Sequence, residues 1–161
     1  MSNADIAQLL AESSNNYNGF NLVFGQMNNL ICFDSVSKKQ QAITPGFHSL
    51  CNGALDDIWP KMALGENKLA NTVQSFEESP LLIDGLFNLM QNTQQAKKDT
   101  LPNTGVPLDW EKRLSSIFIV SPEYGTRTTN ILLQDNEGKI TIYDRSYNEL
   151  GYSITKQCFS I

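Results

Sequence analysis

Asn52 and Arg127 are residues of the types that stabilise negative charge in binding and catalytic sites. Asn52 ends the segment "FHSLCN", and its amide could donate a hydrogen bond to an oxyanion or satisfy backbone groups at a strand end. Arg127 stands in "YGTRTTN", before the strand-like "ILLQD". It needs an anion or ordered water, and the structural alternative is an ion pair with Glu123, Asp135 or Asp144. From the residues alone, the structural interpretation is favoured at both positions.

The strand expected after Arg127 decides which way its side chain points. Successive side chains of a strand alternate between the two faces of the sheet. We expect Arg127 and Thr129 to share one face, with Ile131 and Leu133 on the other. On this expectation, the guanidinium lies beside a threonine and away from the apolar side of the strand.

Other chemistries lack residues of the right kind. His48 is the single histidine, and the three cysteines (Cys32, Cys51 and Cys158) are far apart, which argues against a metal site. A serine or cysteine triad would need His48 as its base, and a lone histidine is more often packed or half exposed than catalytic. The sequence has no glycine-rich phosphate-binding pattern. We therefore expect no metal and no other cofactor.

The composition limits the class of protein and its partners. A chain of 161 residues that is 40% hydrophobic can bury the core of one domain, which we expect to span residues 5–161. Residues 1–4 include "SNA", which is typical of a cloning scar. A formal net charge of −5 argues against a nucleic-acid partner and an anionic membrane surface. No apolar run is long enough for a membrane span, and an odd number of separated cysteines favours reduced thiols in the cytoplasm.

The elements that must position these residues are predicted from hydrophobic period and turn residues. Helices are expected at 4–13, at 58–76, at 80–92 with Ser79 as the cap and Pro80 in the first turn, and as a short turn at 109–114. A hairpin is expected from strands 20–26 and 30–35, because the asparagines between them tolerate positive φ.

Further strands complete the expected sheets. A weak strand at 41–44, a turn at Pro45-Gly46 and a second strand at 47–52 are expected. Four more strands are expected at 115–121, 126–135, 139–147 and 152–161. The polar segment 96–109 is expected to be a functional or covering loop. Helices grouped between strands predict an α+β fold in which helices cover antiparallel sheets.

Four separated motifs resemble one family in order and spacing. They are "YNGFNL" at 17–22, "LCNGALDDIWPK" at 50–61, "LPNTGVPLDWEKRLSSIFI" at 101–119 and "YGTRTTNILL" at 124–133. The resemblance is to the NRDE family, which includes the transport and Golgi organisation 2 proteins of eukaryotes. Members normally begin Met-Cys and then carry an Asn-Arg-Asp-Glu signature, and this sequence has neither. The chain therefore resembles the C-terminal portion of such a protein.

The resemblance implies a fold and a role. The family is similar to N-terminal-nucleophile cysteine hydrolases, which have a four-layer αββα sandwich. Asn52 would then stabilise an oxyanion and Arg127 would support the nucleophile's surroundings, both facing a site that the missing N-terminal half completes. Ligand contacts are expected from Asn52, Trp59, Tyr124, Thr126 and Arg127. Without the first cysteine, the chain itself is expected not to be catalytic.

The function expected for the intact protein is intracellular trafficking, or handling of a small ligand such as haem or lipid, and the alternative is amide hydrolysis. A ligand would need an apolar cavity, and the aromatic candidates to line it, which would otherwise be ordinary core, are Phe20, Phe24, Trp59, Trp110 and Phe118. The missing strands would leave sheet edges unpaired, which predicts self-association as a homodimer, through those edges or by exchange of the N-terminal helix.

Overall fold

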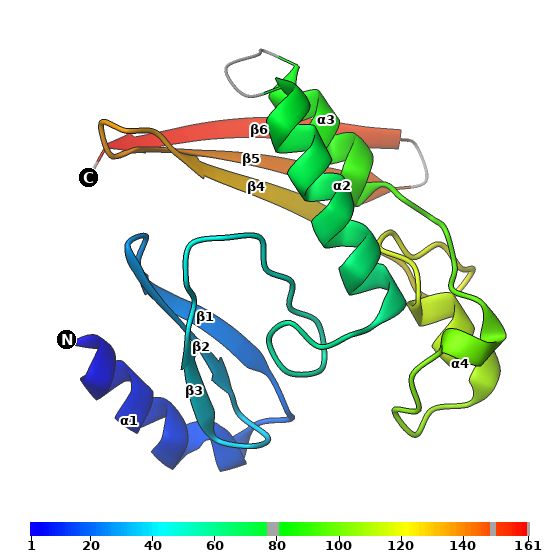
Figure 1. Ribbon diagram of the computed structural model, residues 1–161, viewed down its shortest axis with the longest axis horizontal. Coiled ribbons are helices and arrows are strands. Elements are labelled where there is room, and N and C mark those ends of the chain that lie inside the picture. Colours follow the sequence, from blue (N-terminus) through cyan, green and yellow to red (C-terminus); the bar gives the residue numbers. More distant parts are fainter. Residues whose placement is uncertain (77–80, 149–150, 161) are drawn as a thin grey trace. The chain divides into compact units, whose positions relative to one another are not determined.

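The computed structural model describes residues 1–76 and 81–148 in full and residues 151–160 by their backbone. Backbone contacts divide the chain into two compact units, Met1–Ile58 and Trp59–Ile161, which we call the first and the second unit (Figure 1). Within the described residues, each unit combines α-helix with one antiparallel sheet of three strands. The expected α+β class is confirmed, and the expectation of a single domain over 5–161 stays a prediction.

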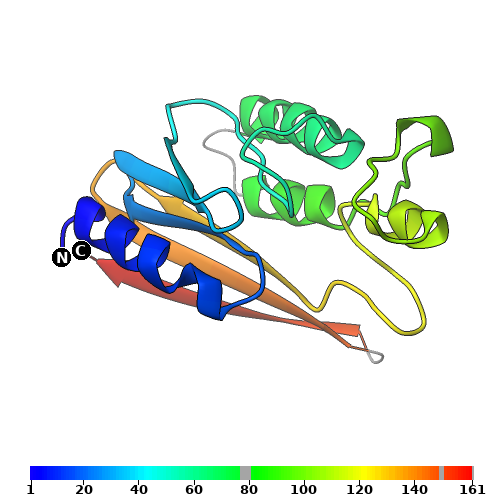
Figure 2. The same cartoon turned by 90° about the horizontal axis from the view of Figure 1, so that it is seen from below.

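The first unit begins with helix α1 (Asn3–Ser13), followed by a short 3₁₀ turn at Ser14–Asn16. Ser2 caps α1 because its Oγ accepts a hydrogen bond from the Asp5 N–H, while the Asp5 carboxylate accepts one from the Ser2 N–H. Strands β1 (Asn21–Gln26), β2 (Asn29–Asp34) and β3 (Lys39–Ala42) pair in that order. Helix α1 runs alongside this sheet and buries Ala7, while Cys32 and Phe33 of β2 are buried within the unit (Figure 2).

The hairpin of β1 and β2 is confirmed, but its turn does not use the expected backbone conformation. Gln26 pairs with Asn29, which leaves Met27 and Asn28 as the connection. Neither of these two residues has positive φ; instead Gly25, inside the end of β1, has a φ of 124°. A Cβ at Gly25 would collide with the carbonyl oxygen of Asn29, so glycine is required both for the dihedral angle and for the close approach.

The expectation of a second strand at 47–52, after the Pro45-Gly46 turn, is wrong. Ile43 still donates its N–H to the Leu30 carbonyl, but the chain then leaves the sheet and remains a loop up to the start of the second unit. In this loop the Asp56 carboxylate accepts a hydrogen bond from the Ser49 N–H, and the Asp56 N–H donates one to the Ser49 carbonyl. No ladder with a neighbouring strand is formed in this part of the described chain. A local side-chain contact therefore replaces strand pairing.

The helices of the second unit follow the predicted positions. They are α2 (Pro60–Phe76), α3 (Leu82–Met90) and α4 (Leu108–Leu114), with a 3₁₀ turn at Lys98–Thr100 in the expected loop. Helices α2 and α3 pack closely at Gly85, where a Cβ would lie 2.9 Å from Cγ2 of Thr72. The expected cap Ser79 and the expected first-turn Pro80 lie outside the described residues.

The second sheet is an antiparallel meander of β4 (Thr128–Gln134), β5 (Lys139–Asn148) and β6 (Gly151–Ser160). Three of the four expected strands are therefore confirmed. The expected strand at 115–121 is wrong, because only an isolated bridge between Val120 and Gly125 forms there among the described residues. The turn between β4 and β5 is stabilised by the Asp135 carboxylate, which accepts hydrogen bonds from the Glu137 and Lys139 N–H groups.

Strand β4 alternates in burial, and this corrects the expected faces. Thr129 and Ile131 are both buried, whereas Asn130 and Leu132 between them are exposed. The expectation that Thr129 opposes Ile131 is wrong, because a period of two residues puts both on one face. In the described residues, β1 and β3 are the edges of one sheet and β4 and β6 those of the other, and pairing of such edges in a homodimer stays a prediction.

Candidate functional site

A cavity of about 580 Å³ lies in the first unit. Its wall is formed by the start of β1, the end of β2 and the loop that follows β3. The side chains around it are mixed in character: Gly19, Phe20, Asn21, Asp34, Val36, Leu50, Cys51 and Asn52. Asn52 is exposed, and within the described residues its amide makes no hydrogen bond, so the group is available to a ligand.

Asn21 holds the loop that carries Asn52. Its Nδ2 donates hydrogen bonds to the carbonyl oxygens of Cys51, at 2.7 Å, and Gly53, at 2.8 Å. A side-chain amide has two N–H donors, and both are used here to fix the residues on either side of Asn52. The sequence motif at 17–22 contains Asn21, but its contact with residues 30 or more positions away is not evident from the sequence.

Replacing Asn21 with alanine is expected to lower the free energy of unfolding by about 1–2 kcal/mol, because two half-buried carbonyl groups lose their donor. Urea titration followed by circular dichroism measures this. The matched control is Asn130→Ala, which removes an exposed asparagine side chain of β4 and is expected to change the stability by less than about 0.5 kcal/mol. Equal effects of the two substitutions would contradict the assignment.

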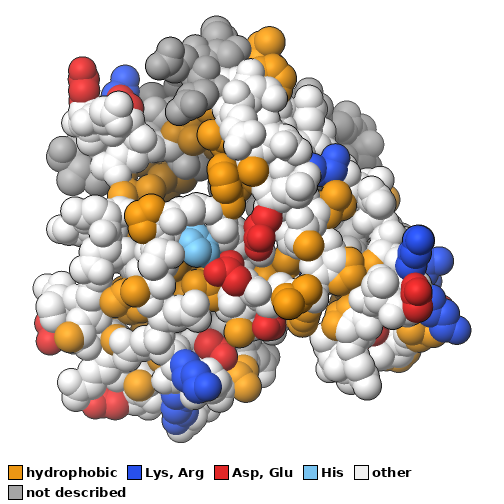
Figure 3. All heavy atoms as spheres, viewed as in Figure 1, with side chains coloured by type: hydrophobic (Ala, Val, Ile, Leu, Met, Phe, Trp, Pro, Cys, Tyr) orange, Lys and Arg blue, Asp and Glu red, His pale blue; other side chains and the backbone are white. Residues whose placement is uncertain are grey.

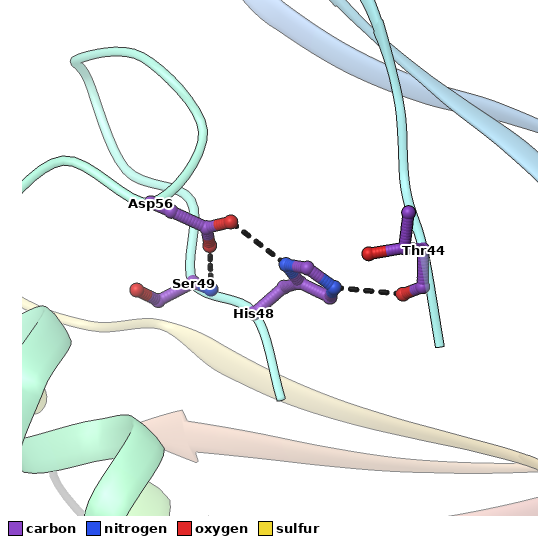
Figure 4. A network of polar contacts seen from close by, with 4 residues as sticks. All are labelled: Thr44, His48, Ser49 and Asp56. Atoms are coloured by element: carbon purple, nitrogen blue, oxygen red, sulfur yellow. Dashed lines mark hydrogen bonds and ion pairs between the residues drawn. The ribbon is translucent and has the colours of Figure 1, made fainter. Parts of the chain in front are cut away.

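The base of the same loop is closed by Asp56 (Figure 4). Oδ1 of Asp56 accepts a hydrogen bond from the Ser49 N–H at 3.0 Å, and the Asp56 N–H donates to the Ser49 carbonyl at 2.9 Å. Asp56 has a φ of 60°, which aspartate tolerates better than most residues. Residues 49–56 therefore form a closed loop. Hydrogen bonds of Asp56 hold its base, and those of Asn21 hold the residues on either side of Asn52.

His48 completes this network. Its Nδ1 lies 2.7 Å from Oδ2 of Asp56, and its Nε2 lies 2.7 Å from the carbonyl oxygen of Thr44. Both side chains reach the surface, and Figure 3 shows the histidine next to an acidic side chain. Because both ring nitrogens already contact acceptors of the protein, His48 is not poised to take a proton from Cys51.

The cavity lining carries one carboxylate, Asp34, and a second, Asp56, closes the base of the loop that borders it. Hydrogen bonding from the Ser37 hydroxyl, opposed by burial and helped by two backbone N–H groups, lowers the pKa of Asp34 below its ordinary value of 3.8. Burial raises the pKa of Asp56, but hydrogen bonds from His48 and Ser49 outweigh it, and the net shift is downward. Burial, followed by the negative charges of Asp34 and Asp56, raises the pKa of the Cys32 thiol. Both carboxylates are therefore ionised at neutral pH.

Tyr124, Thr126 and Arg127 lie in the second unit, in the segment before β4. Thr126 is tied to Ile119 by two hydrogen bonds, one from its N–H to the Ile119 carbonyl and one from the Ile119 N–H to its Oγ1. The Tyr124 ring meets the edge of Trp110 at 6.2 Å between centroids. The Arg127 side chain is exposed, and only its carbonyl is engaged, by the Tyr147 N–H at 2.8 Å.

The structural alternative for Arg127 finds no support in the described part of the chain, where no ion pair joins its guanidinium to Glu123, Asp135 or Asp144. Trp59 stands at the beginning of α2, with the Lys61 ammonium 5.8 Å from its ring centroid. Asn52 therefore lines a cavity of the first unit, whereas the other four expected ligand contacts belong to the second unit. Their convergence on one site stays a prediction.

The aromatic candidates also divide between the units. Phe20 lines the cavity of the first unit, and Phe24 is a half-buried residue of β1. In the second unit, Trp110 contacts Tyr124, and Phe118 contacts the ring of Tyr147 at 4.8 Å between centroids. The contacts of these two side chains with neighbouring rings agree with the alternative that they are ordinary packing residues.

Arg145 is a buried residue that the sequence interpretation missed. It is 5% exposed, pairs with Thr129 across the strands, and places its guanidinium carbon 3.7 Å from the centroid of the Phe87 ring. Next to it, the Tyr147 hydroxyl donates to Thr129 Oγ1 at 3.2 Å. Residues 143, 145 and 147 lie on one face of β5, so the sequence places Arg145 between two tyrosines, but its contact with Phe87 of α3 is not evident from the sequence.

Comparison with known proteins shows a family match over most of the chain. The sequence model of the family described as Transport and Golgi organisation 2 matches residues 1–149. The Transport and Golgi organization protein 2 homolog of Homo sapiens is 28% identical over 141 residues, and that of Bos taurus 25% over 145 residues. Each alignment covers 81% of this chain and 51% of the relative, so the chain spans about half the length of the curated relatives it matches. Among the described residues, no helix has the length and apolar character needed to cross a membrane.

Proposed function

Because the chain belongs to the Transport and Golgi organisation 2 family, we propose that it serves intracellular trafficking by binding a small lipid-like molecule in the cavity of its first unit. The family's relatives are named for transport and Golgi organisation. The chain would carry out this function in the cytoplasm, where its cysteines stay reduced. The role is one of binding, and no step of it requires a nucleophile.

The observation that carries this proposal is the cavity itself. Its volume, about 580 Å³, lies within the range of about 300–1,000 Å³ that is usual for small-molecule sites. Phe20, Val36 and Leu50 offer apolar surface to a hydrocarbon, while Asn21 and Asn52 contribute amides at the same cavity. A mixed lining of this kind suits a ligand with an apolar part and a polar end.

The negative charge of Asp34 favours one kind of polar end. A carboxylate attracts a cationic or hydrogen-bond-donating group and repels an anion. Haem carries propionate groups, and a fatty acid carries a carboxylate, so both would meet this repulsion. A lipid with a phosphocholine headgroup is zwitterionic, so its terminal quaternary ammonium can approach the carboxylate while its phosphate stays farther away, and its acyl chain can lie against the apolar side chains. We therefore prefer such a lipid over haem as the ligand.

The test is a fluorescence titration of the chain with lysophosphatidylcholine carrying a nitrobenzoxadiazole label on its acyl chain. Leu50→Asp is expected to weaken binding by about tenfold or more, because a charge would enter the apolar part of the cavity. Haemin and a fatty acid with the same label are expected to bind more weakly than the choline lipid.

The control variant is Leu9→Asp, which introduces the same charge at an exposed position on α1 of the same unit. It is expected to leave the affinity within about twofold of wild type. Circular dichroism establishes that both variants are folded. The proposal is wrong if the labelled lipid does not saturate, or if Leu50→Asp and Leu9→Asp bind it equally well.

Amide hydrolysis by the intact protein is the second candidate, and the presentation of Asn52 favours it. Asn21 fixes the carbonyl groups on both sides of Asn52, and a held amide at a cavity is suited to stabilising an oxyanion. On this proposal, the two helix-flanked sheets would be parts of an αββα sandwich similar to N-terminal-nucleophile hydrolases. The deciding measurement is the amidase activity of a full-length relative before and after its first cysteine is changed to alanine. An activity that is absent, or that survives the change, excludes this mechanism.

A further inference from the structure

The contacts of His48 require a particular protonation state. A backbone carbonyl such as that of Thr44 can only accept a hydrogen bond. The Asp56 carboxylate is ionised at neutral pH, since its pKa is lowered, and it too can only accept. With an acceptor at 2.7 Å from each ring nitrogen, both contacts are hydrogen bonds only when both nitrogens carry a proton. The geometry therefore fits the imidazolium cation.

The contacts of His48 are linked to the cavity through Asp56 and the loop 49–56. Asp56 closes the base of the loop 49–56 through Ser49, and this loop carries Leu50, Cys51 and Asn52, which line the cavity. A neutral imidazole has one N–H and can keep one of its two contacts as a donor. Loss of the proton from His48 therefore breaks one of the two contacts that make up the clamp: the contact with Asp56 at the base of the loop, or the contact with Thr44 that holds the ring beside it.

Among the charged or titratable groups around the loop, His48 is the one expected to change its charge between pH 5 and 8. The strands that hold the loop carry Cys32 and Asp34 in β2 and Lys39 in β3, and β1 carries none. The loop itself carries Cys51 and Asp57 in addition. Asp34 is already ionised in this range, because its pKa is lowered, and burial raises the pKa of Cys32. Histidine is the side chain whose ordinary pKa, about 6.5, lies within it.

We propose that His48, Asp56 and Thr44 form a pH-sensitive clamp that holds the loop 49–56 closed against the cavity at mildly acidic pH and releases it at alkaline pH. The consequence for binding rests on the proposed function, because it assumes that the cavity takes a ligand. The clamp contributes stability while His48 is protonated and loses it as the pH rises through the titration of His48. It also fails in strong acid, when the pH falls through the lowered pKa of Asp56, below 3.8.

Nuclear magnetic resonance tests the clamp without any ligand. The chain has one histidine, so in the untagged protein the ring signals belong to His48. Between pH 5.5 and 8.0, the Ser49 amide, which donates to Asp56, is expected to shift with the same midpoint as the His48 ring. In His48→Gln, which has no titrating ring, this shift is expected to disappear. A Ser49 amide that ignores the His48 titration, or that shifts equally in His48→Gln, overturns the proposal.

The binding measurement adds a second, independent readout. The choline headgroup does not titrate in this range, so labelled lysophosphatidylcholine is a suitable probe. Because the contact is partly exposed, its affinity for wild type is expected to be only about threefold to tenfold weaker at pH 8.0 than at pH 5.5. His48→Gln is expected to show no such difference. Equal affinity of the wild type at pH 5.5 and pH 8.0 overturns the clamp. Absence of binding at every pH refutes the proposed function, and the Ser49 amide measurement then decides whether the clamp exists.

Discussion

Replacement of Phe87 by alanine is expected to lower the free energy of unfolding by about 3–5 kcal/mol. Phe87 is 1% exposed, and its ring is the surface against which the buried guanidinium of Arg145 lies, at 3.7 Å from the centroid. The substitution leaves a cavity between α3 and the sheet and removes the cation–π contact as well. Urea unfolding followed by far-ultraviolet circular dichroism measures the change.

Two further variants separate the contributions at Phe87. Phe87→Leu keeps most of the apolar volume but has no aromatic face, so it is expected to cost less than Phe87→Ala, with about 1 kcal/mol of the remaining loss from the cation–π contact. Phe47→Ala removes a ring that is 43% exposed and is expected to cost about 1 kcal/mol or less. A loss at Phe87 no larger than that at Phe47 would contradict the role of this ring in the core.

Replacement of Gly25 by alanine is expected to lower the free energy of unfolding by about 2–4 kcal/mol. A φ of 124° strains any residue with a Cβ, and that Cβ would also collide with the Asn29 carbonyl oxygen across the hairpin. The hairpin can relieve the collision only by moving β1 away from β2. The same urea titration measures the loss.

Gly105→Ala is the matched control for Gly25→Ala. Gly105 also has positive φ, 91°, but a Cβ there would have no atom within 4 Å. Its substitution is therefore expected to cost only the dihedral strain, about 1 kcal/mol. Because β1 carries Asn21 and β2 carries Asp34, Gly25→Ala is also expected to weaken binding of the labelled lipid, whereas Gly105→Ala is not. Equal losses of stability would show that the close approach to Asn29 is unimportant.

The elements that sequence reasoning predicted correctly are those with strong local signals. The helix over α2 has apolar residues at helical spacing after an early proline, and the meander of β4, β5 and β6 has short turns between β-rich segments. The strands predicted at 47–52 and 115–121 do not form, because in the described chain no neighbouring strand pairs with either segment. Segment 47–52 instead belongs to a loop organised by Asp56, and segment 115–121 keeps only the Val120 to Gly125 bridge.

The candidate site was predictable only in part. Asn52 could be selected from its residue type and its motif, and it does line a cavity. The residue that positions its loop, Asn21, is separated from that loop by 30 or more positions, and no periodic pattern reports such a contact. The network of His48 and Asp56 is not predictable from the sequence either, because residue type presents a lone histidine as a base or a metal ligand and does not report the two acceptors that the fold places beside its ring.

The topology of the two sheets has a consequence for biosynthesis. In the part of the chain that the structure describes, each sheet pairs strands that follow one another in sequence, and the wall of the cavity comes from residues 19–52. Pairing between consecutive strands closes short loops, which favours rapid folding. The hairpin and its neighbour can therefore assemble on the ribosome as soon as this stretch has left the exit tunnel, while the helices and the meander that follow are still being translated.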